Sequence, residues 1–213
     1  MADEISEKYW SRFSATYDEN QEYVVGKDFL NEVKTNLNKL VDLGEVLELG
    51  CGTGYFTEAI VKNAEQVFAT DLSEELLKKA RERLGNKDKI TFQKEDCMNI
   101  SFTSNNFDTV LMVNLIHVIE DPSKTLQECF RVLKNDGSLI ITSFTNYGMK
   151  PLEIIKLGFR YIKVWGKPPK YTHRFSPDSL CSLIESTGFS IEESRVLGDK
   201  TKSLFIIGKK KMI

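Results

Sequence analysis

The sequence has few cysteines and histidines, no long apolar run and no excess of charge of either sign. Its cysteines, Cys51, Cys97, Cys129 and Cys181, form no CxxC pair, so neither a zinc site nor a small disulfide framework is expected. The 29 Lys and Arg residues nearly balance the 31 Asp and Glu residues, which argues against a general nucleic-acid-binding protein. No stretch reaches the roughly 18 apolar residues that a membrane-spanning helix needs. The first residues are acidic and polar, unlike a secretory signal or a transit peptide, and we expect a cytoplasmic protein.

The composition that remains is that of an ordinary soluble domain. Hydrophobic residues make up 41% of the 213 residues and charged residues 28%, which excludes a disordered or low-complexity chain. The length corresponds to a single domain, residues 1–213, with an elaboration. Within it we distinguish a helical segment (1–40), a core (41–145), an insertion (146–175) and a C-terminal helix with two strands (176–213).

Short apolar segments alternate with helix-period segments through most of the chain. The helix predicted over residues 74–84 has an N-cap at Ser73 and a stop at Gly85, so its start and end signals agree. Strands separated by helices are typical of βαβ units, and two final strands joined by a short turn predict an antiparallel hairpin. We therefore expect an α/β fold with a Rossmann-like, doubly wound, mostly parallel sheet of seven strands. The predicted strands are residues 45–49, 66–70, 89–93, 107–113, 138–144, 189–196 and 203–207.

Three glycines, Gly50, Gly52 and Gly54, follow the first predicted strand at alternate positions. Glycine at such a turn permits left-handed backbone and close approach of a ligand, although a simple tight turn would also explain the pattern. The spacing is GxGxG, whereas the dinucleotide fingerprint is GxGxxG, and residue 55 is Tyr. The spacing therefore makes an NAD-dependent oxidoreductase the least favoured interpretation.

Acidic residues stand near the ends of the first three predicted strands. Glu48 precedes the glycine loop, Asp71 ends the second strand, and Asp96 follows the third. At the carboxyl ends of strands in an open α/β sheet, Asp71 is placed to accept bonds from ribose hydroxyls and Asp96 from an adenine amine. An exposed helix-start charge and a loop cap are the alternatives for these two aspartates. Three acids with no Arg for a phosphate favour a nucleoside ligand that lacks phosphates.

Several stretches together resemble a known family. They are VLELGCGTG, ATDLSEELLKKAR, the KEDC loop, FDTVLMVNLIHVIEDP and RVLKNDGSLIIT. The chain resembles the class I S-adenosylmethionine-dependent methyltransferases, in the small-molecule branch (type 11, UbiE-like). The resemblance covers about residues 40 to 145 and the C-terminal hairpin typical of that fold. Each motif alone has low specificity, and the combination is what identifies the family.

The resemblance implies S-adenosylmethionine as cofactor, in a cofactor-binding core at 41–145. Gly50 and Gly52 would approach its methionine part, and Glu48 would hold its ammonium. Asp71 would bind the ribose, with Leu72 packing on the adenine. The ten cofactor-binding residues it implies are Tyr17, Glu48, Gly50, Cys51, Gly52, Asp71, Leu72, Asp96, Cys97 and Asn114.

The remaining implied contacts lie at both ends of the cofactor. Asp96 and the backbone of Cys97 would read the adenine edge, and Asn114 would sit beside the methionine part and the substrate. Tyr17 belongs to an N-terminal helical lid (1–40) and would help close the methionine end. Cys51 occupies a loop position that is often Cys in this family, and no chemical role is expected for it.

The expected reaction is methyl transfer to a small-molecule acceptor by in-line displacement. Its main requirement is alignment of donor and nucleophile in a dry site. A general base is needed only for an acceptor that arrives protonated. His117 is the catalytic candidate and His173 a substrate-binding candidate, with a structural role open for each. Metal catalysis is not expected, and the attacking atom of the acceptor is not identified.

The insertion at residues 146–175 holds seven Lys or Arg against one acid, Glu153. On a helix, its basic residues form a narrow stripe and apolar residues cover most of the remaining circumference. Three interpretations stay open: a buried cap helix with a solvated basic edge, a lid that attracts an anionic or lipophilic acceptor, or a helix that docks on an anionic membrane. The stripe is Lys156, Arg160, Lys163 and Lys167, and Pro168-Pro169 is expected to end the helix.

Two further functions stay open as alternatives to soluble small-molecule methylation. One is C-methylation of a quinone-like lipid at a membrane surface, favoured by the apolar, basic insertion. The other is a non-catalytic regulator that binds S-adenosylmethionine, because binding and turnover use separable groups. Expected partners are the small-molecule acceptor, with no nucleic acid, in a monomer or homodimer.

Overall fold

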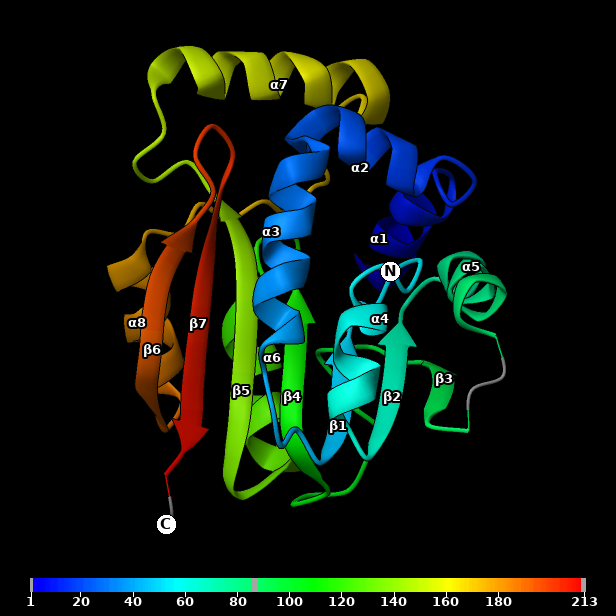
Figure 1. Cartoon of the computed structure of the whole chain (residues 1–213), viewed down its shortest axis with the longest axis vertical. Coiled ribbons are helices and arrows are strands. Elements are labelled where there is room, and N and C mark those ends of the chain that lie inside the picture. Colours follow the sequence, from blue (N-terminus) through cyan, green and yellow to red (C-terminus); the bar gives the residue numbers. More distant parts are fainter. Residues whose placement is uncertain (1, 86–87, 212–213) are drawn as a thin grey trace.

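The computed structural model describes residues 2–85 and 88–211. In these residues seven strands form one sheet in the order β3-β2-β1-β4-β5-β7-β6 (Figure 1). All pairs from β3 to β5 are parallel, whereas β7 runs antiparallel between β5 and β6. This confirms the predicted mostly parallel sheet with a C-terminal hairpin. The strands are β1 (Glu45–Leu49), β2 (Gln66–Asp71), β3 (Ile90–Lys94), β4 (Phe107–Val113), β5 (Leu133–Thr145), β6 (Phe189–Leu197) and β7 (Lys202–Lys210).

Helices cover both faces of the sheet, and further helices lie across one end of it (Figure 1). The helices are α1 (Ala2–Ser11), α2 (Tyr17–Val25), α3 (Lys27–Asn38), α4 (Thr57–Ile60), α5 (Glu74–Leu84), α6 (Pro122–Val132), α7 (Pro151–Trp165) and α8 (Pro177–Ser186). None of the described helices combines the length and apolar character needed to cross a membrane.

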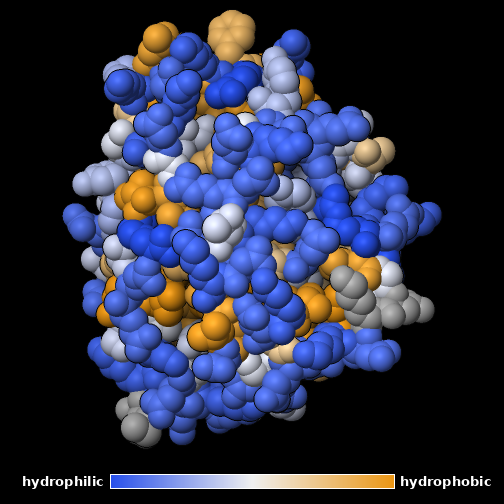
Figure 2. All heavy atoms as spheres, in the orientation of Figure 1, coloured by the Kyte–Doolittle hydropathy of each residue, from blue (hydrophilic) through white to orange (hydrophobic). Residues whose placement is uncertain are grey.

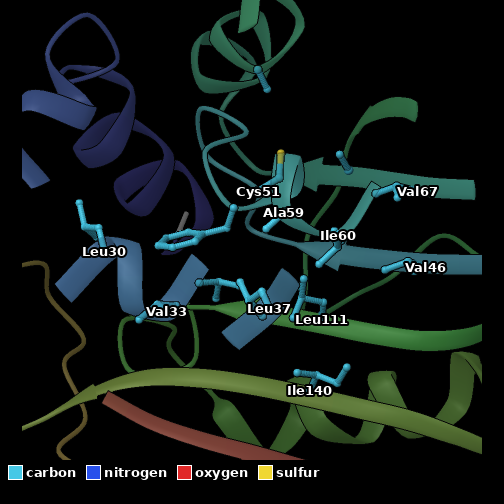
Figure 3. Packing of buried hydrophobic residues seen from close by; sticks show 14 of the residues in the cluster. Leu30, Val33, Leu37, Val46, Cys51, Ala59, Ile60, Val67, Leu111 and Ile140 are labelled. Carbon is cyan, nitrogen blue, oxygen red and sulfur yellow. The ribbon is translucent and has the colours of Figure 1, made fainter. Parts of the chain in front are cut away.

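Alternating strand residues build one core cluster on each face of the sheet. On one face, strand residues such as Val46 and Leu111 meet apolar residues of α3 and α4, as Figure 3 shows for Leu37 and Ile60. On the other face, the neighbouring strand residues pack against α6 and α8. The central strand β4 is covered on both sides, so its residues 110–113 read as a continuous apolar run in the sequence.

Local signals explain where several helices begin and end. Ser73 accepts a hydrogen bond from the backbone of Leu76, and Gly85 follows α5 with φ of 64°, as the sequence predicted. Asp121 caps α6 in the same manner. The sequence prediction was wrong for the end of α7, which stops at Trp165 ahead of Pro168-Pro169. Gly166 ends it by taking a left-handed conformation, with φ of 72°.

The N-terminal segment and the insertion pack together as a roof, which we define as α1, α2 and α7. The rings of Phe13 and Trp165 lie edge to face at 4.8 Å, and Arg12 donates a hydrogen bond to the Trp165 carbonyl at 3.0 Å. The hydroxyls of Tyr9 and Tyr161 are 2.9 Å apart. Tyr9, Phe13 and Tyr17 are four residues apart, but the chain turns between α1 and α2, so they do not form one continuous helical stripe. The rings of Phe13 and Tyr17 pack instead against Trp165.

The carboxyl ends of the parallel strands point toward this roof (Figure 1). Loops that follow β1, β2, β3 and β4 therefore meet beneath α1, α2 and α7. In open α/β sheets this edge is where ligands bind.

Candidate active site

The glycine loop after β1 has left-handed backbone at each of its three glycines. Gly50, Gly52 and Gly54 have φ of 69°, 57° and 76°. A Cβ on Gly50 would lie 2.9 Å from a methyl of Leu115, so a side chain is excluded there by both backbone and space. A Cβ on Gly52 would meet nothing nearer than Tyr17, at 3.9 Å. The backbone of Gly52 therefore faces open space beneath Tyr17.

Asp71, at the end of β2, is bound to the glycine loop. One carboxylate oxygen accepts from the Gly52 N–H and the other from the Ser73 N–H, both at 2.9 Å. Burial raises the pKa of Asp71 to about 6, although the backbone N–H groups act in the opposite direction. The side chain is thus held rigidly at the carboxyl edge of the sheet.

Glu48 and Cys51 lie beneath the loop. The Glu48 carboxylate is 1% exposed and accepts a hydrogen bond from the Thr57 hydroxyl at 2.6 Å. Burial raises its pKa to about 7. Cys51 is also buried, and burial raises the pKa of its thiol. Neither Glu48 nor Cys51 lines the cavity that adjoins the glycine loop, which is described next. Contact of Glu48 with the ammonium of a cofactor therefore remains a prediction.

A cavity of about 110 Å³, the loop cavity, lies between the glycine loop and the ends of β2, β3 and β4. Asp96 lines this cavity, and its carboxylate accepts a hydrogen bond from the Met98 N–H at 2.8 Å. Cys97 lines the cavity beside the Thr125 hydroxyl, and burial raises the pKa of its thiol to about 12. The structure brings eight of the ten predicted cofactor residues to this cavity. They are Tyr17, Gly50, Gly52, Asp71, Leu72, Asp96, Cys97 and Asn114.

A second cavity of about 320 Å³, the roof cavity, lies between the roof and the sheet. Its lining is mostly apolar and aromatic, and its charged lining residues are Arg174 and Lys202, with no Asp or Glu among the described residues that line it. The two cavities adjoin, because four residues line both of them. These are Trp10, Tyr17, Asn114 and Val118.

Asn114 stands at the junction of the two cavities. It follows β4 with a φ of 56°, and its backbone N–H is bound by the Thr142 carbonyl. Both polar atoms of its side-chain amide are buried and lack a hydrogen-bond partner within the described residues. A buried unsatisfied polar group costs about 1–3 kcal/mol, and at this junction the amide is available to a ligand.

Both predicted histidines line the roof cavity. Burial lowers the pKa of His117 to about 4, so its ring is neutral at pH 7, with Nδ1 3.4 Å from the Ser143 hydroxyl. His173 donates from Nε2 to the Ile119 carbonyl at 2.9 Å, and its ring stacks on Phe175. This bond fixes the tautomer of His173 and leaves Nδ1 as an acceptor.

The N-terminal helices are anchored on the glycine loop by Asp18. Its carboxylate accepts from the Thr53 hydroxyl at 2.6 Å and pairs with the Arg83 guanidinium. Tyr17, the neighbouring residue, is thereby placed over Gly52, and burial raises its pKa further above the ordinary tyrosine value. Among the described residues, no group of three or more His, Cys, Asp or Glu converges as a metal site would require.

Sequence reasoning missed most of the roof's contribution to the cavities. Trp10 lines both cavities, and Tyr161 and Trp165 line the roof cavity. Trp10 stands beside Tyr9 and near Phe13 and Tyr17, and this aromatic clustering is the one local signal that could have indicated it. Lys202 comes from β7, and no local pattern marks it.

The strand order defines a Rossmann-like fold, and acidic residues line the cavity at the carboxyl edge of its sheet, where such folds bind ligands. Residues 47–141 match the family model described as a methyltransferase domain. The chain is 31% identical over 148 residues to a demethylmenaquinone methyltransferase of Clavibacter sepedonicus, a match that covers 68% of this chain and 59% of the relative. These similarities support a class I S-adenosylmethionine-dependent methyltransferase of the UbiE-like type.

One further curated relative and one solved structure are similar to this chain. The chain is 27% identical over 151 residues to a ubiquinone biosynthesis O-methyltransferase of Coxiella burnetii, covering 68% of this chain and 63% of the relative. The chain thus spans less than two thirds of these curated relatives. A solved S-adenosylmethionine-dependent methyltransferase of Methanosarcina mazei superposes with a TM-score of 0.67 at 23% identity, over 84% of this chain and 98% of that one. This last similarity supports the fold alone.

Proposed function

We propose that this protein transfers the methyl group of S-adenosylmethionine to a small, largely apolar acceptor. The observation that carries the proposal is the junction of the acidic loop cavity with an apolar cavity at Tyr17 and Asn114. A donor in the loop cavity would face an acceptor in the roof cavity across these two side chains. Such adjacency is what an in-line displacement between two bound molecules requires.

The residues of the loop cavity fit the proposed cofactor. Asp71 offers carboxylate oxygens at the position expected for ribose hydroxyls, and the open backbone at Gly52 admits a close ligand. The unpartnered amide of Asn114 offers both a donor and an acceptor. When bound, S-adenosylmethionine supplies a methyl group on a sulfonium with a good leaving group, so no strong nucleophile from the protein is required.

The chain's own residues then align the acceptor and exclude water. The roof aromatics close the site, and a dry site strengthens the acidic contacts to a cationic cofactor. His117 is neutral because of its low pKa. It accepts a hydrogen bond from the substrate, and it takes the substrate's proton only when that proton is acidic. His173, with Nε2 bound to Ile119, presents Nδ1 as a second acceptor for the substrate.

The lining of the roof cavity supports a specific chemical class of acceptor. Apolar and aromatic side chains suit an apolar ring, and Arg174 and Lys202 suit an anionic or electron-rich oxygen on that ring. The names of the demethylmenaquinone and ubiquinone relatives point to the same class. The cavity volume accommodates a ring, and a long tail would extend beyond it.

The loop cavity, at about 110 Å³, is smaller than the roughly 300 Å³ or more of an ordinary small-molecule site. We infer that the N-terminal helices move outward when the cofactor enters. Tyr17 and Trp10 are the side chains that must shift, because they lie over the loop and line both cavities.

The test is turnover with a panel of hydroxylated ring compounds and S-adenosylmethionine, read out as S-adenosylhomocysteine formed. We expect at least one compound to be methylated and Asn114→Ala to reduce the rate without unfolding the protein. Binding of S-adenosylmethionine without turnover of any compound would instead support the non-catalytic alternative. Absence of S-adenosylmethionine binding would overturn the proposal.

A further inference from the structure

The outward side of α7 is an exposed apolar stripe. Leu152, Ile155, Phe159 and Ile162 are 60%, 62%, 78% and 62% exposed, and they recur at the helical spacing of three and four residues. Among the described residues seven large hydrophobic side chains are exposed, and four of them form this stripe. Figure 2 shows apolar side chains protruding at the top of the molecule, where Figure 1 places α7. Trp165 is the one buried residue of the helix, so the prediction of a buried cap helix was wrong.

Basic side chains border the apolar stripe. Lys156 and Lys163 are exposed beside it, and Lys150, Lys167 and Lys170 are exposed near its two ends. Glu153, the single acid of the helix, is paired with Lys156 at 2.9 Å. Residues 146–175 carry seven basic groups against this one acid, although the whole chain has a net charge of −2. The segment that carries the exposed apolar stripe therefore has a net positive charge, whereas the rest of the chain has a net negative charge.

We propose that α7 docks on an anionic lipid surface, with the stripe in the acyl boundary and the lysines at the headgroups. Helices with an apolar face and a basic border lie in membrane interfaces in this way. A second copy of the chain is a poorer match, because a two-fold interface would place the same lysines opposite one another. The occupant that the charge pattern fits is a surface of negative headgroups.

Docking would bring the lipid surface to the roof cavity. Ile162 lines that cavity and is also 62% exposed, and Pro168 and Pro169 line the cavity just beyond the end of α7. A lipophilic acceptor could then enter from the lipid while its tail stayed in it. This consequence rests on the proposed function, whereas docking itself does not.

The test is co-sedimentation of the full chain with vesicles of phosphatidylcholine and phosphatidylglycerol, compared with vesicles of phosphatidylcholine alone. We expect binding to the anionic vesicles that weakens at high salt, because salt screens the lysine contacts. Ile155→Ser with Phe159→Ser should lower the partition coefficient at least tenfold, since each side chain loses apolar burial. Lys156→Glu with Lys163→Glu should lower it at least tenfold as well, because each basic residue contributes about fivefold or more.

Matched controls separate this stripe from general surface effects. Val41→Ser removes another exposed apolar side chain, 69% exposed, in the loop before β1, and Lys78→Glu reverses an exposed charge on α5. Both should bind vesicles as the unchanged protein does. All variants alter exposed positions, so thermal unfolding and S-adenosylmethionine binding should be unaffected, which distinguishes failure of docking from failure of the proposed function.

Three results would overturn docking. One is an unchanged protein that stays in the supernatant with anionic vesicles. Another is a stripe variant that binds as strongly as the controls. The third is sedimentation equilibrium that shows a dimer abolished by Phe159→Ser with no vesicle binding, which would make the stripe an interface between copies.

Discussion

The loop cavity and the roof differ in how they are built. The loop cavity rests on backbone groups and carboxylates close in sequence, such as the bonds from Gly52 and Ser73 to Asp71. The roof rests on side-chain contacts between distant segments, such as Tyr9 with Tyr161, which are 152 positions apart. Contacts like those of the loop cavity suit a ligand that many related proteins share. Contacts like those of the roof can differ from one protein to the next, and the roof borders the proposed site of the methyl acceptor.

The largest expected effect is the loss of the roof's central ring. Trp165 is 4% exposed and its ring packs against Trp10, Phe13 and Tyr17. Trp165→Ala should lower the free energy of unfolding by about 3–5 kcal/mol, as large-to-small core substitutions do. Urea unfolding measures this change.

The matched control lies on the same helix. Phe159 is 78% exposed, so Phe159→Ala should leave the free energy of unfolding within about 0.5 kcal/mol of the original. Equal losses of unfolding free energy in the two variants would contradict the conclusion that Trp165 holds α7 in the roof.

Two buried carboxyls of the loop region should make the free energy of unfolding depend on pH. Burial holds the pKa of Glu48 at about 7 and that of Asp71 at about 6, above the ordinary carboxyl values near 4. A carboxyl whose pKa rises on folding binds its proton more tightly in the folded state. Its stabilisation is complete below about pH 4 and is lost as the pH rises through about 6 to 7. Each carboxyl should therefore lose roughly 2–3 kcal/mol of unfolding free energy over this window. Buried His117, whose pKa is lowered to about 4, loses stabilisation as the pH falls below about 6.5, so it offsets part of this change.

Urea unfolding between pH 4.5 and 7.5 tests this dependence. Asp71→Asn and Glu48→Gln should each flatten the curve, because an amide does not titrate in this range. S-adenosylmethionine should stabilise the protein more at pH 7.5 than at pH 5, since a cationic ligand favours the ionised carboxylates. A stability curve that rises across the window would contradict the assigned pKa shifts.

The next expected effect is on cofactor affinity. Asp71→Ala should weaken S-adenosylmethionine binding roughly 10–100-fold at pH 7.5, because a charge-assisted hydrogen bond contributes about 1.5–3 kcal/mol. Isothermal titration calorimetry provides the affinity. Asp108→Ala is the control, since Asp108 pairs with Lys134 and accepts from the Glu45 N–H at the beginning of β1, the opposite edge of the sheet. Equal affinities for both variants would remove Asp71 from the site.

The smallest effect should come from the contact that joins the two regions. Asp18 pairs with Arg83 at the surface, where an ion pair contributes about 1 kcal/mol or less. Asp18→Asn should therefore weaken S-adenosylmethionine binding only a few-fold, while Glu82→Gln, in the exposed pair with Lys79, should have no effect on it. A tenfold or greater loss for Asp18→Asn would show that the roof contributes as much to cofactor binding as the loop does.

The same difference explains what could be predicted from sequence. The strands, the Ser73 cap and the glycine loop depend on neighbouring residues, so the fold followed from local patterns, and the eight cavity-lining residues followed from these patterns together with the family resemblance. Glu48 lies beneath the loop because side chains alternate across β1, and the hydrogen bond to Thr57 could not be foreseen from the strand alone. The sequence left the orientation of the α7 stripe open among three interpretations. This orientation depends on Trp165 packing against a segment about 150 residues earlier in the chain.

A crystal structure grown with S-adenosylhomocysteine tests the central claim most directly. We expect the ribose hydroxyls of this ligand at the Asp71 carboxylate and its amino-acid part against Gly50 and Gly52. We expect its sulfur to be directed past Asn114 toward the roof cavity. Density for the ligand anywhere else, or a sulfur directed away from the roof cavity, would contradict it.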